Sequence, residues 1–394
     1  MRHNFDKVID RRQTPSYKWN PDFLKNVFGT GDVQPMWVAD MDFEVSPAIS
    51  EAIVKRTAHG VFGYEYKTDN NKESLMDWYK NRHQWSFAKK DLLFAPSVLT
   101  AIAVILETLT EQGDGVIVQT PVYHQFFSII KNTKRKVVRN PLTYKEGRYA
   151  IDFDDLREKA KDPATKVLLL SNPHNPVGRV WTKEELQIMG LIAKENDLII
   201  ISDDIHADII HKGYTYTPMA SLSEDLAQST ITCLSPGKTF NLSGISTAAM
   251  VVENPSHKEA MEGFMNAFHI NATNTLSMTA FEAAYKEGGP WFDDFMAYME
   301  GNLQVVKDFI QTELKDIHLV ETEGTYLVWL DLSAYKMEAD ALQKHLVSTG
   351  KLGLDAGHWF GREGSGFFRL NMATPRVHLE KALENLKFAL DQLA

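Results

Sequence analysis

Short apolar runs alternate with amphipathic segments from about residue 46 to residue 286. The runs are bounded by Gly, Pro, Asn or Asp and are rich in β-branched and aliphatic residues, which is typical of strands. The predicted strands are Leu92–Ala95, Gly115–Gln119, Lys166–Leu170, Leu198–Ser202, Thr230–Leu234 and Ala248–Val252. Between them, 99–112 and 183–195 carry apolar residues at helical spacing. The alternation predicts βαβ units, and hence an α/β fold with a mostly parallel central sheet flanked by helices.

The pattern changes after residue 286. Residues 291–314 read as one long helix, followed by strands near 326–331 and 366–371 and a closing helix from Val377 onward. We therefore predict a large domain over 46–286 and a smaller α+β domain built from 287–394 together with 1–45. The first 45 residues show no clear periodicity, and we expect them to wrap onto the small domain or onto a neighbouring chain.

Composition narrows the class of protein. With 394 residues, 44% hydrophobic and 24% charged, the chain can build two buried cores. A net charge of -10 argues against nucleic-acid binding, which needs a basic face. The single cysteine, Cys233, excludes an internal disulfide framework and a Cys-rich zinc cluster. Because no apolar stretch suits a signal peptide or a membrane span, we expect a cytoplasmic protein without membrane contact.

Polar residues follow several of the predicted strands, where ligands bind in open α/β sheets. After 92–95 comes Ser97, at the start of a helix whose exposed N–H groups favour a phosphate, although taken alone this position is better explained by ordinary capping. After 166–170 come two Asn-Pro steps, 172–173 and 175–176, which restrict the loop and can hold an amide side chain still. An ordinary turn is the alternative.

Asp203 stands at the end of the strand Leu198–Ser202. A carboxylate leaving an apolar strand is costly to desolvate unless it meets a cation or a donor, and a protonated pyridine nitrogen is such a partner. Two alternatives remain: Asp203 caps a turn, or His206, Asp208 and His211 bind a metal. Their offsets match no standard metal-ligand spacing, so we predict no metal site.

Lys238 follows the strand Thr230–Leu234 in the run Ser235-Pro236-Gly237-Lys238-Thr239. Proximity to apolar strand residues lowers the pKa of a lysine and makes it a nucleophilic amine. The Gly-Lys-Thr triplet is not a P-loop, because that motif needs Gly where Thr232 stands. Arg369 lies in the last predicted strand, and its guanidinium matches either a substrate carboxylate or an internal ion pair.

Taken in order, the Asn-Pro loop, the strand-end Asp203, Lys238 preceded by Ser235, and the late Arg369 resemble the class I and II aminotransferase superfamily, the pyridoxal-phosphate (PLP) enzymes of fold type I. Along nearly the whole chain the sequence looks closest to the carbon-sulfur β-lyases, that is, cystathionine β-lyase-like enzymes. The runs that carry this resemblance are 35–43 (PMWVADMDF), 62–64 (FGY) and 202–208 (SDDIHAD).

The resemblance implies a role for each residue. Lys238 carries the cofactor as a Schiff base, Asp203 keeps the pyridine nitrogen protonated, and Asn175 bonds the ring hydroxyl oxygen. Tyr123 lies against the ring, and Tyr64 reaches the phosphate from a second subunit, which implies a homodimer with shared sites. The remaining implied contacts are His206 to the cofactor, Ser235 and the N–H groups of Val98 and Leu99 to the phosphate, and Arg369, Asn175 and Ala39 to the substrate.

Three positions depart from the family pattern. Many relatives have an arginine eight residues after the lysine as a phosphate ligand, whereas this chain has Ser246. The acid after Asp203 is often Glu and is Asp204 here, and Gly237 stands where a small hydroxyl residue is common. Only the first of these changes removes a charge.

The function that the resemblance implies is α,β-elimination from a sulfur-containing amino acid such as cystathionine, cysteine or a cysteine S-conjugate, giving a thiol, pyruvate and ammonia. In this chemistry the freed Lys238 removes the Cα proton and the cofactor ring accepts the electrons. If the proton returns to the cofactor carbon instead, the same residues perform transamination, so an aminotransferase is the alternative. A non-catalytic scaffold is a third reading, which the presence of Lys238 disfavours.

Overall fold

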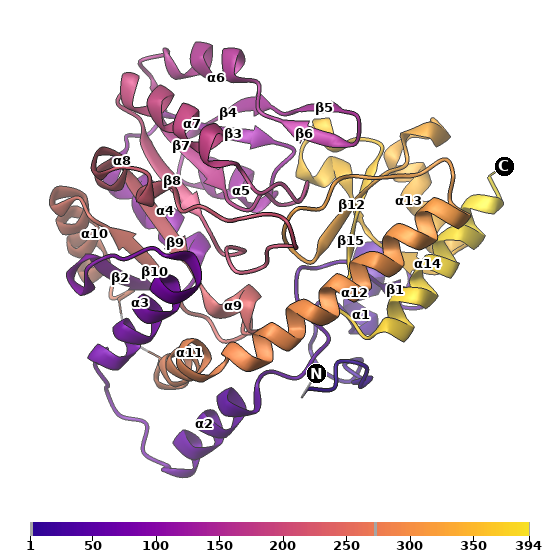
Figure 1. Cartoon of the computed structure of the whole chain (residues 1–394), viewed down its shortest axis with the longest axis horizontal. Helices are drawn as coiled ribbons and strands as arrows, with labels where there is room; N and C mark the ends of the chain where they lie inside the picture. The colour runs from indigo at the N-terminus through magenta and orange to yellow at the C-terminus, as the bar shows by residue number, and fades with distance from the viewer. Residues whose placement is uncertain (1–2, 272–273, 394) are drawn as a thin grey trace.

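The computed structural model describes residues 3–271 and 274–393. A seven-stranded sheet with helices on both faces forms one part of the molecule, and a smaller four-stranded sheet forms the other (Figure 1). The large sheet has the order β2-β10-β9-β8-β7-β3-β4. Its strands are β2 (Leu92–Ala95), β10 (Ala248–Val252), β9 (Thr230–Leu234), β8 (Ile199–Asp203), β7 (Thr165–Ser171), β3 (Gly115–Thr120) and β4 (Lys136–Pro141). The predicted α/β class and mostly parallel sheet are confirmed.

One strand runs against the others. β10 is antiparallel to both β9 and β2, while β9, β8, β7, β3 and β4 are parallel. One reversed strand is compatible with the predicted mostly parallel sheet. A parallel crossover usually contains a full helix that packs on the sheet. The link from Leu234 to Ala248 contains only the four-residue helix α9 (Pro236–Thr239), and β10 returns antiparallel beside β9.

Alternating strand residues face two helical layers. On one face, Val116 and Val118 of β3 pack with the helices α4 (Val98–Leu109), α5 (Gln125–Asn132) and α10 (Pro255–Ala267). On the other face, Ile117 packs with α6 (Phe153–Ala160), α7 (Lys183–Glu195) and α8 (Glu224–Ser229). A third cluster joins the β2 and β10 edge to α3 (Asp69–His83), α11 (Thr275–Glu287) and the small sheet. The helix α2 (Pro47–Ala58) packs against α11.

The small sheet is antiparallel, in the order β11-β12-β15-β14. Its strands are β11 (His318–Leu319), β12 (Leu327–Asp331), β15 (Phe367–Asn371) and β14 (Asp355–Ala356). The long helix α12 (Gly289–Glu313) and the closing helix α14 (Arg376–Asp391) lie against each other beside it, together with α13 (Ala339–Ser348) (Figure 1). The two predicted strands and both predicted helices are present, with ends shifted by one or two residues. A β5–β6 hairpin (Thr143–Lys145 and Arg148–Ala150) completes the strands of the large part.

The N-terminal segment lies along the small sheet. Its strand β1 (Gln34–Pro35) pairs with β13 (Leu352–Gly353), and the Asp42 N–H donates to the Ala373 carbonyl at 3.0 Å. The segment also contains a helix that the periodicity did not predict, α1 (Pro21–Phe28). The capping residues give its position instead. Asn20 accepts from the first turn, proline follows at N1, and Gly29 ends the helix in the left-handed region at φ 79°.

Candidate active site

The carboxyl ends of several strands meet at one edge of the large sheet. In register, Ser171 of β7 lies opposite Asp203 of β8, and Asp203 lies opposite Cys233 of β9. On the other side of β10, β2 ends at Ala95 opposite Ala248, next to the end of β9. This register brings the predicted strand-end loops after β2, β3, β7, β8 and β9 to the same edge. One edge of the sheet therefore collects residues that are far apart in the sequence.

Lys238 lies on α9, directly after β9, and its side chain is half-buried. Its Nζ donates to the Ala39 carbonyl oxygen and lies 3.4 Å from the Ser243 hydroxyl. Burial lowers the pKa of this amine to about 8, and the nearby Asp40 and Asp203 carboxylates limit the fall. A substantial fraction of Lys238 is therefore neutral near pH 8, as a nucleophile or a base requires.

The predicted strand-end carboxylate is buried. Asp203 accepts a hydrogen bond from the Ile205 backbone N–H at 3.2 Å, and burial raises the pKa of its carboxyl to about 7. Asp204 faces a different environment, where Ser202 donates to it at 2.5 Å and the Tyr216 hydroxyl donates to its other oxygen. Its carboxyl pKa is also raised by burial, to about 7. Of the two, Asp203 is the carboxylate that would gain most from a cationic partner.

His206 follows Asp203 by three residues and is also buried. In the described part of the chain, its Nδ1 has no hydrogen-bond partner. Burial lowers the pKa of His206 well below its ordinary range, and the charges of Lys238 and Arg369 act in the same direction. His206 is thus a neutral imidazole with an unused polar atom, a feature that native proteins keep for a ligand or a water.

Arg369 lies in the middle of β15, 3% exposed, directly opposite Asp355 of β14. Its Nε and Nη2 donate to one Asp355 oxygen at 3.0 and 2.6 Å, and its Nη1 donates to the Asn175 amide oxygen at 2.7 Å. The internal ion pair, which was one of the two alternatives for Arg369, is therefore present. A guanidinium has five N–H groups, so these three bonds leave one on Nη1 and one on Nη2, enough to bind a carboxylate end-on.

Asn175 connects the two parts of the molecule. It lies in the loop after β7, where both Asn-Pro bonds are cis, and its backbone carbonyl accepts from the Tyr123 N–H at 3.0 Å. Since its side-chain oxygen accepts from Arg369, its Nδ2 is the end that can donate to a ligand. Tyr123 itself is half-buried beside this loop, and burial raises the pKa of its phenol.

The sequence predicted Ala39 as a site residue but not the hydrogen-bonded turn at residues 38–40 that holds it. Val38 has φ 54°, which is rare for a β-branched residue. The Asn371 amide nitrogen donates to the Val38 and Asp40 carbonyls at 2.7 and 2.6 Å, and Tyr326 donates to the Ala39 carbonyl at 2.9 Å. These bonds aim the Ala39 oxygen at Lys238. Asn371 stands two residues after Arg369, on the same face of its strand, which is the sequence signal that could have revealed it.

The region predicted to hold a phosphate is built around the start of α4. Ser97 caps this helix by accepting from the Thr100 N–H at 3.1 Å. The N–H groups of Val98 and Leu99, the first two helical residues, have no acceptor within a helix. Ser235 is already engaged, because its Oγ donates to the Thr247 carbonyl at 2.9 Å and accepts from the Gly237 N–H at 3.1 Å.

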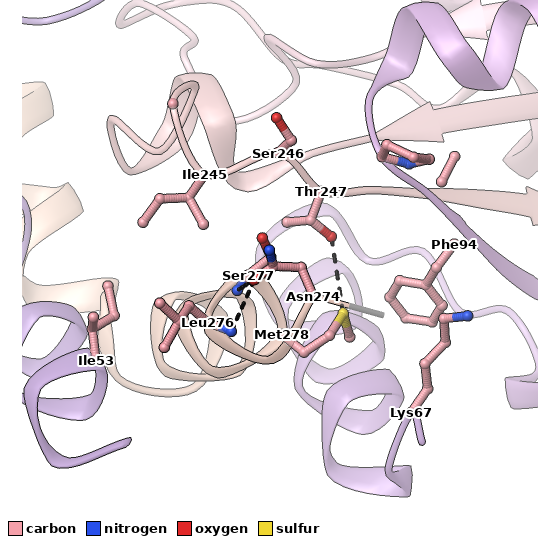
Figure 2. Close-up of a pocket in the computed structure, with 13 residues that line it drawn as sticks. Ile53, Lys67, Phe94, Ile245, Ser246, Thr247, Asn274, Leu276, Ser277 and Met278 are labelled. Atoms are coloured by element: carbon pink, nitrogen blue, oxygen red, sulfur yellow. Dashed lines mark hydrogen bonds between the residues drawn. The ribbon is translucent and has the colours of Figure 1, made fainter. Parts of the chain in front are cut away.

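A cavity of about 460 Å³ opens beside this helix start, and it is lined in part by Pro96, Ser246 and Thr247 (Figure 2). Ser246 is the position where many relatives have a phosphate-binding arginine. Lys67 also lines the cavity, and its Nζ donates to the Asn271 carbonyl at 2.5 Å. Burial lowers the pKa of Lys67, with Lys72 acting in the same direction.

Tyr64 is not brought to the candidate site within a single chain, and the residues of the alternative metal site do not come together. Tyr64 is fully exposed, in a segment where Val61, Phe62 and Tyr66 are exposed too, so its contact with a second subunit stays a prediction. Two residues of the alternative metal site have other partners. His211 contacts Glu300 at 2.9 Å, whereas Asp208 accepts hydrogen bonds from His83, Trp78 and Thr239. Among residues 3–271 and 274–393, no group of three His, Cys, Asp or Glu side chains could hold a metal ion.

The residues present fit PLP. A half-buried amine faces a buried carboxyl whose raised pKa calls for a cationic partner, and a neutral imidazole offers an unused nitrogen. The start of α4 offers backbone N–H groups for a phosphate. In the described residues, no helix is long and apolar enough to cross a membrane.

Comparison with known proteins agrees with this geometry. The family described as aminotransferase class I and II matches residues 36–386. Cystathionine β-lyase PatB of Bacillus subtilis is 39% identical over 387 residues, covering 98% of this chain and 100% of that protein. The crystal structure of cystalysin from Treponema denticola, which contains a pyridoxal 5'-phosphate cofactor, is 37% identical with a TM-score of 0.96 and covers 100% of both chains. A PLP-bound putative aminotransferase from Clostridium difficile 630 is 38% identical, with a TM-score of 0.96 over 98% of this chain and 100% of the other. The chain therefore belongs to the aminotransferase class I and II family.

Proposed function

We propose that the protein is a PLP-dependent carbon-sulfur β-lyase that cleaves cystathionine, cysteine or related cysteine S-conjugates. The observation that carries the proposal is that a half-buried lysine, Lys238, whose pKa is lowered to about 8, lies within electrostatic reach of the buried Asp203 carboxyl. The likeness to cystathionine β-lyase PatB over the full length favours sulfur substrates over other amino acids.

Each residue has a defined task in this chemistry. When bound, PLP supplies an aldehyde carbon for amines and a ring that accepts the electron pair of the Cα–H bond. With PLP bound, Asp203 would balance the positive charge on the ring nitrogen, Asn175 Nδ2 would donate to the ring hydroxyl oxygen, and the unpartnered His206 Nδ1 would be available to the cofactor. Lys238 Nζ would hold the cofactor at rest, and as a free amine it would take the Cα proton.

The substrate carboxylate is bound by the two remaining N–H groups of Arg369. Asp355 and Asn175 hold the guanidinium in one orientation, which fixes the Cα–H bond relative to Lys238. The electron pair of the Cβ–S bond leaves with the sulfur as a thiolate. With one water the balance is substrate to thiol, pyruvate and ammonia.

The functional unit that we propose is a homodimer with shared sites. The exposed aromatic segment around Tyr64 supports this, because such residues usually pack at an interface. The cavity beside the start of α4 offers room for Tyr64 of the partner subunit to approach the phosphate. The two-domain division at residues 46 and 286 stays part of the same proposal.

The decisive experiment incubates the pure PLP-loaded protein with cystathionine or cysteine, without a keto acid. Elimination predicts pyruvate and a thiol in equal amounts. If product forms only when a keto acid is added, the protein is an aminotransferase, which the same residues also support.

The matched variant is Lys238→Ala. We expect the visible absorbance band of the bound cofactor to change and activity to fall by at least about 10⁴-fold, because base and cofactor anchor are lost together. Borohydride should fix the cofactor to residue 238 in the wild type and not in the variant. A wild-type protein that stays colourless with PLP and shows no fixation would refute the proposal.

A further inference from the structure

Asp208 is a buried carboxylate that the chemistry above does not use, and it accepts a hydrogen bond from Thr239, the residue after Lys238. Asp208 is 8% exposed and accepts three hydrogen bonds. The donors are Trp78 Nε1 at 2.8 Å, His83 Nε2 at 2.7 Å and Thr239 Oγ1 at 2.6 Å. Trp78 and His83 belong to α3, whereas Thr239 belongs to α9. Asp208 thus joins α9 to a long helix that packs outside the site.

Asp208 also belongs to the loop that carries Asp203 and His206. Asp203 and Asp208 are five positions apart in the sequence. Within this loop the Ala207 and Ile209 N–H groups donate to the Asp204 and His206 carbonyls at 3.0 and 2.9 Å. The loop is therefore tight. At its start it carries the carboxylate of the site, and at its end it holds the residue that follows Lys238.

The helix that carries Lys238 cannot hold itself in place. α9 has four residues, far below the length at which a helix is stable alone. Its first turn is fixed by the Ser235 cap, through the Gly237 N–H. The Ser243 hydroxyl donates to the Gly237 carbonyl at 3.2 Å, which ties α9 to the turn that follows it. The Thr239 hydroxyl donates to Asp208 at 2.6 Å, which ties α9 to the loop after β8.

We propose that Asp208 and Thr239 are positioning residues that set the place of Lys238 Nζ relative to Asp203. The proposal rests on the PLP function proposed above. Thr239 is buried with its hydroxyl bonded to Asp208, and it acts by fixing the backbone on which Lys238 stands. Through Asp208, one loop sets the positions of both the proton-moving amine and the carboxylate opposite the ring nitrogen.

The test compares two donors to the same carboxylate. Thr239→Val keeps the side-chain shape and removes the hydroxyl that joins α9 to Asp208. Trp78→Phe removes a different donor to Asp208 without touching Thr239 Oγ1. Each holoenzyme is measured for kcat and KM, for melting temperature, and for the pH midpoint of the visible absorbance band of the bound cofactor.

For Thr239→Val we expect kcat to fall about 10-fold with little change in KM, because a small displacement of a reacting group slows chemistry more than binding. The absorbance midpoint should rise by about 0.5 unit, since a looser α9 admits water to the buried amine. Thr239→Ser, which restores the hydroxyl, should recover both values. Trp78→Phe should lower the melting temperature and leave kcat and the midpoint near the wild type.

The proposal is overturned if Thr239→Val retains the wild-type kcat and midpoint, or if Trp78→Phe shifts both as much as Thr239→Val. If Thr239→Val does not fold, Thr239→Ser decides alone, and altered spectra or kcat in that folded variant contradict the proposal. A wild-type protein without a cofactor band is a different result, because it refutes the PLP function itself.

Discussion

Asp203 and Asp208 stand five residues apart on one loop, both buried, and their carboxyl pKa values shift in opposite directions. For Asp203, burial raises the pKa to about 7, although a backbone N–H donor and the nearby Lys238 both act to lower it. For Asp208, burial also acts to raise the pKa, but hydrogen bonds and the charge of His83, together with Thr239 and Trp78, outweigh it and lower the pKa.

The contrast shows that burial by itself does not decide what a carboxylate does. The partners around it decide, because hydrogen-bond donors and a nearby positive charge stabilise the charged form, and at Asp208 His83 supplies both. Asp208 has its charge satisfied by the protein and serves as an anchor. The charged form of Asp203 is only weakly stabilised by the protein, and a bound cationic ring would stabilise it further. Reactive and structural roles are thus separated within one turn of chain.

The largest expected effect comes from removing the charge of Asp203 while keeping its shape. In Asp203→Asn the ring nitrogen loses its counter-charge, so we expect kcat for elimination to fall about 10³-fold, the usual cost of losing one electrostatic partner at a reacting centre. Steady-state kinetics on the holoenzyme measures this. Asp204→Asn is the matched control, because Asp204 bonds Ser202 and Tyr216 instead, and its kcat should fall less than about 10-fold. An equal fall in kcat in Asp203→Asn and Asp204→Asn would contradict the separate roles given to these two carboxylates.

A comparable effect is expected on the stability of the cofactor-free protein. The folded pKa of Asp203 lies above its unfolded value of 3.8, so between about pH 4 and pH 7 the folded state holds a proton that the unfolded state has released. The free energy of unfolding should therefore decrease as pH rises through this window, by on the order of 4 kcal/mol from this group. Urea unfolding at several pH values checks this. The measured quantity is the difference in slope between the wild type and Asp203→Asn, because Asp204 contributes a slope of the same sign.

The smallest effect concerns Asp208. Its lowered pKa means the opposite linkage: the stabilisation is present above pH 3.8 and is lost as pH falls through the lower, folded pKa. Asp208→Asn replaces one acceptor with an amide nitrogen that faces a donor, so we expect a loss of about 2 kcal/mol in the free energy of unfolding near pH 7. Denaturant titration measures it. A variant as stable as the wild type would show that Trp78, His83 and Thr239 find other partners.

The candidate site residues could be selected from the sequence because strand-end loops are local in sequence. Lys238, Asp203 and Asn175 each stand in the loop after an apolar run, and the family resemblance implied their roles. Asp355, Tyr326 and Asn371 were not predicted. Asp355 acts through the register of two neighbouring strands of the small sheet, and Tyr326 and Asn371 act through backbone carbonyls of the N-terminal segment. No local sequence pattern records either kind of contact. The helix α1 was missed because it is short and is defined by its caps rather than by its periodicity.

By itself, the sequence determined the α/β class, the strands that end in polar loops, and the residue types that chemistry needs, because hydrophobic periodicity and strand boundaries are encoded within a few residues. Only the tertiary structure decided the reversed direction of β10, the pairing of Arg369 with Asp355, the placement of the Ala39 oxygen on Lys238, and the opposite electrostatic states of Asp203 and Asp208. These depend on burial and on donors from distant segments, and both quantities exist only once the chain is folded.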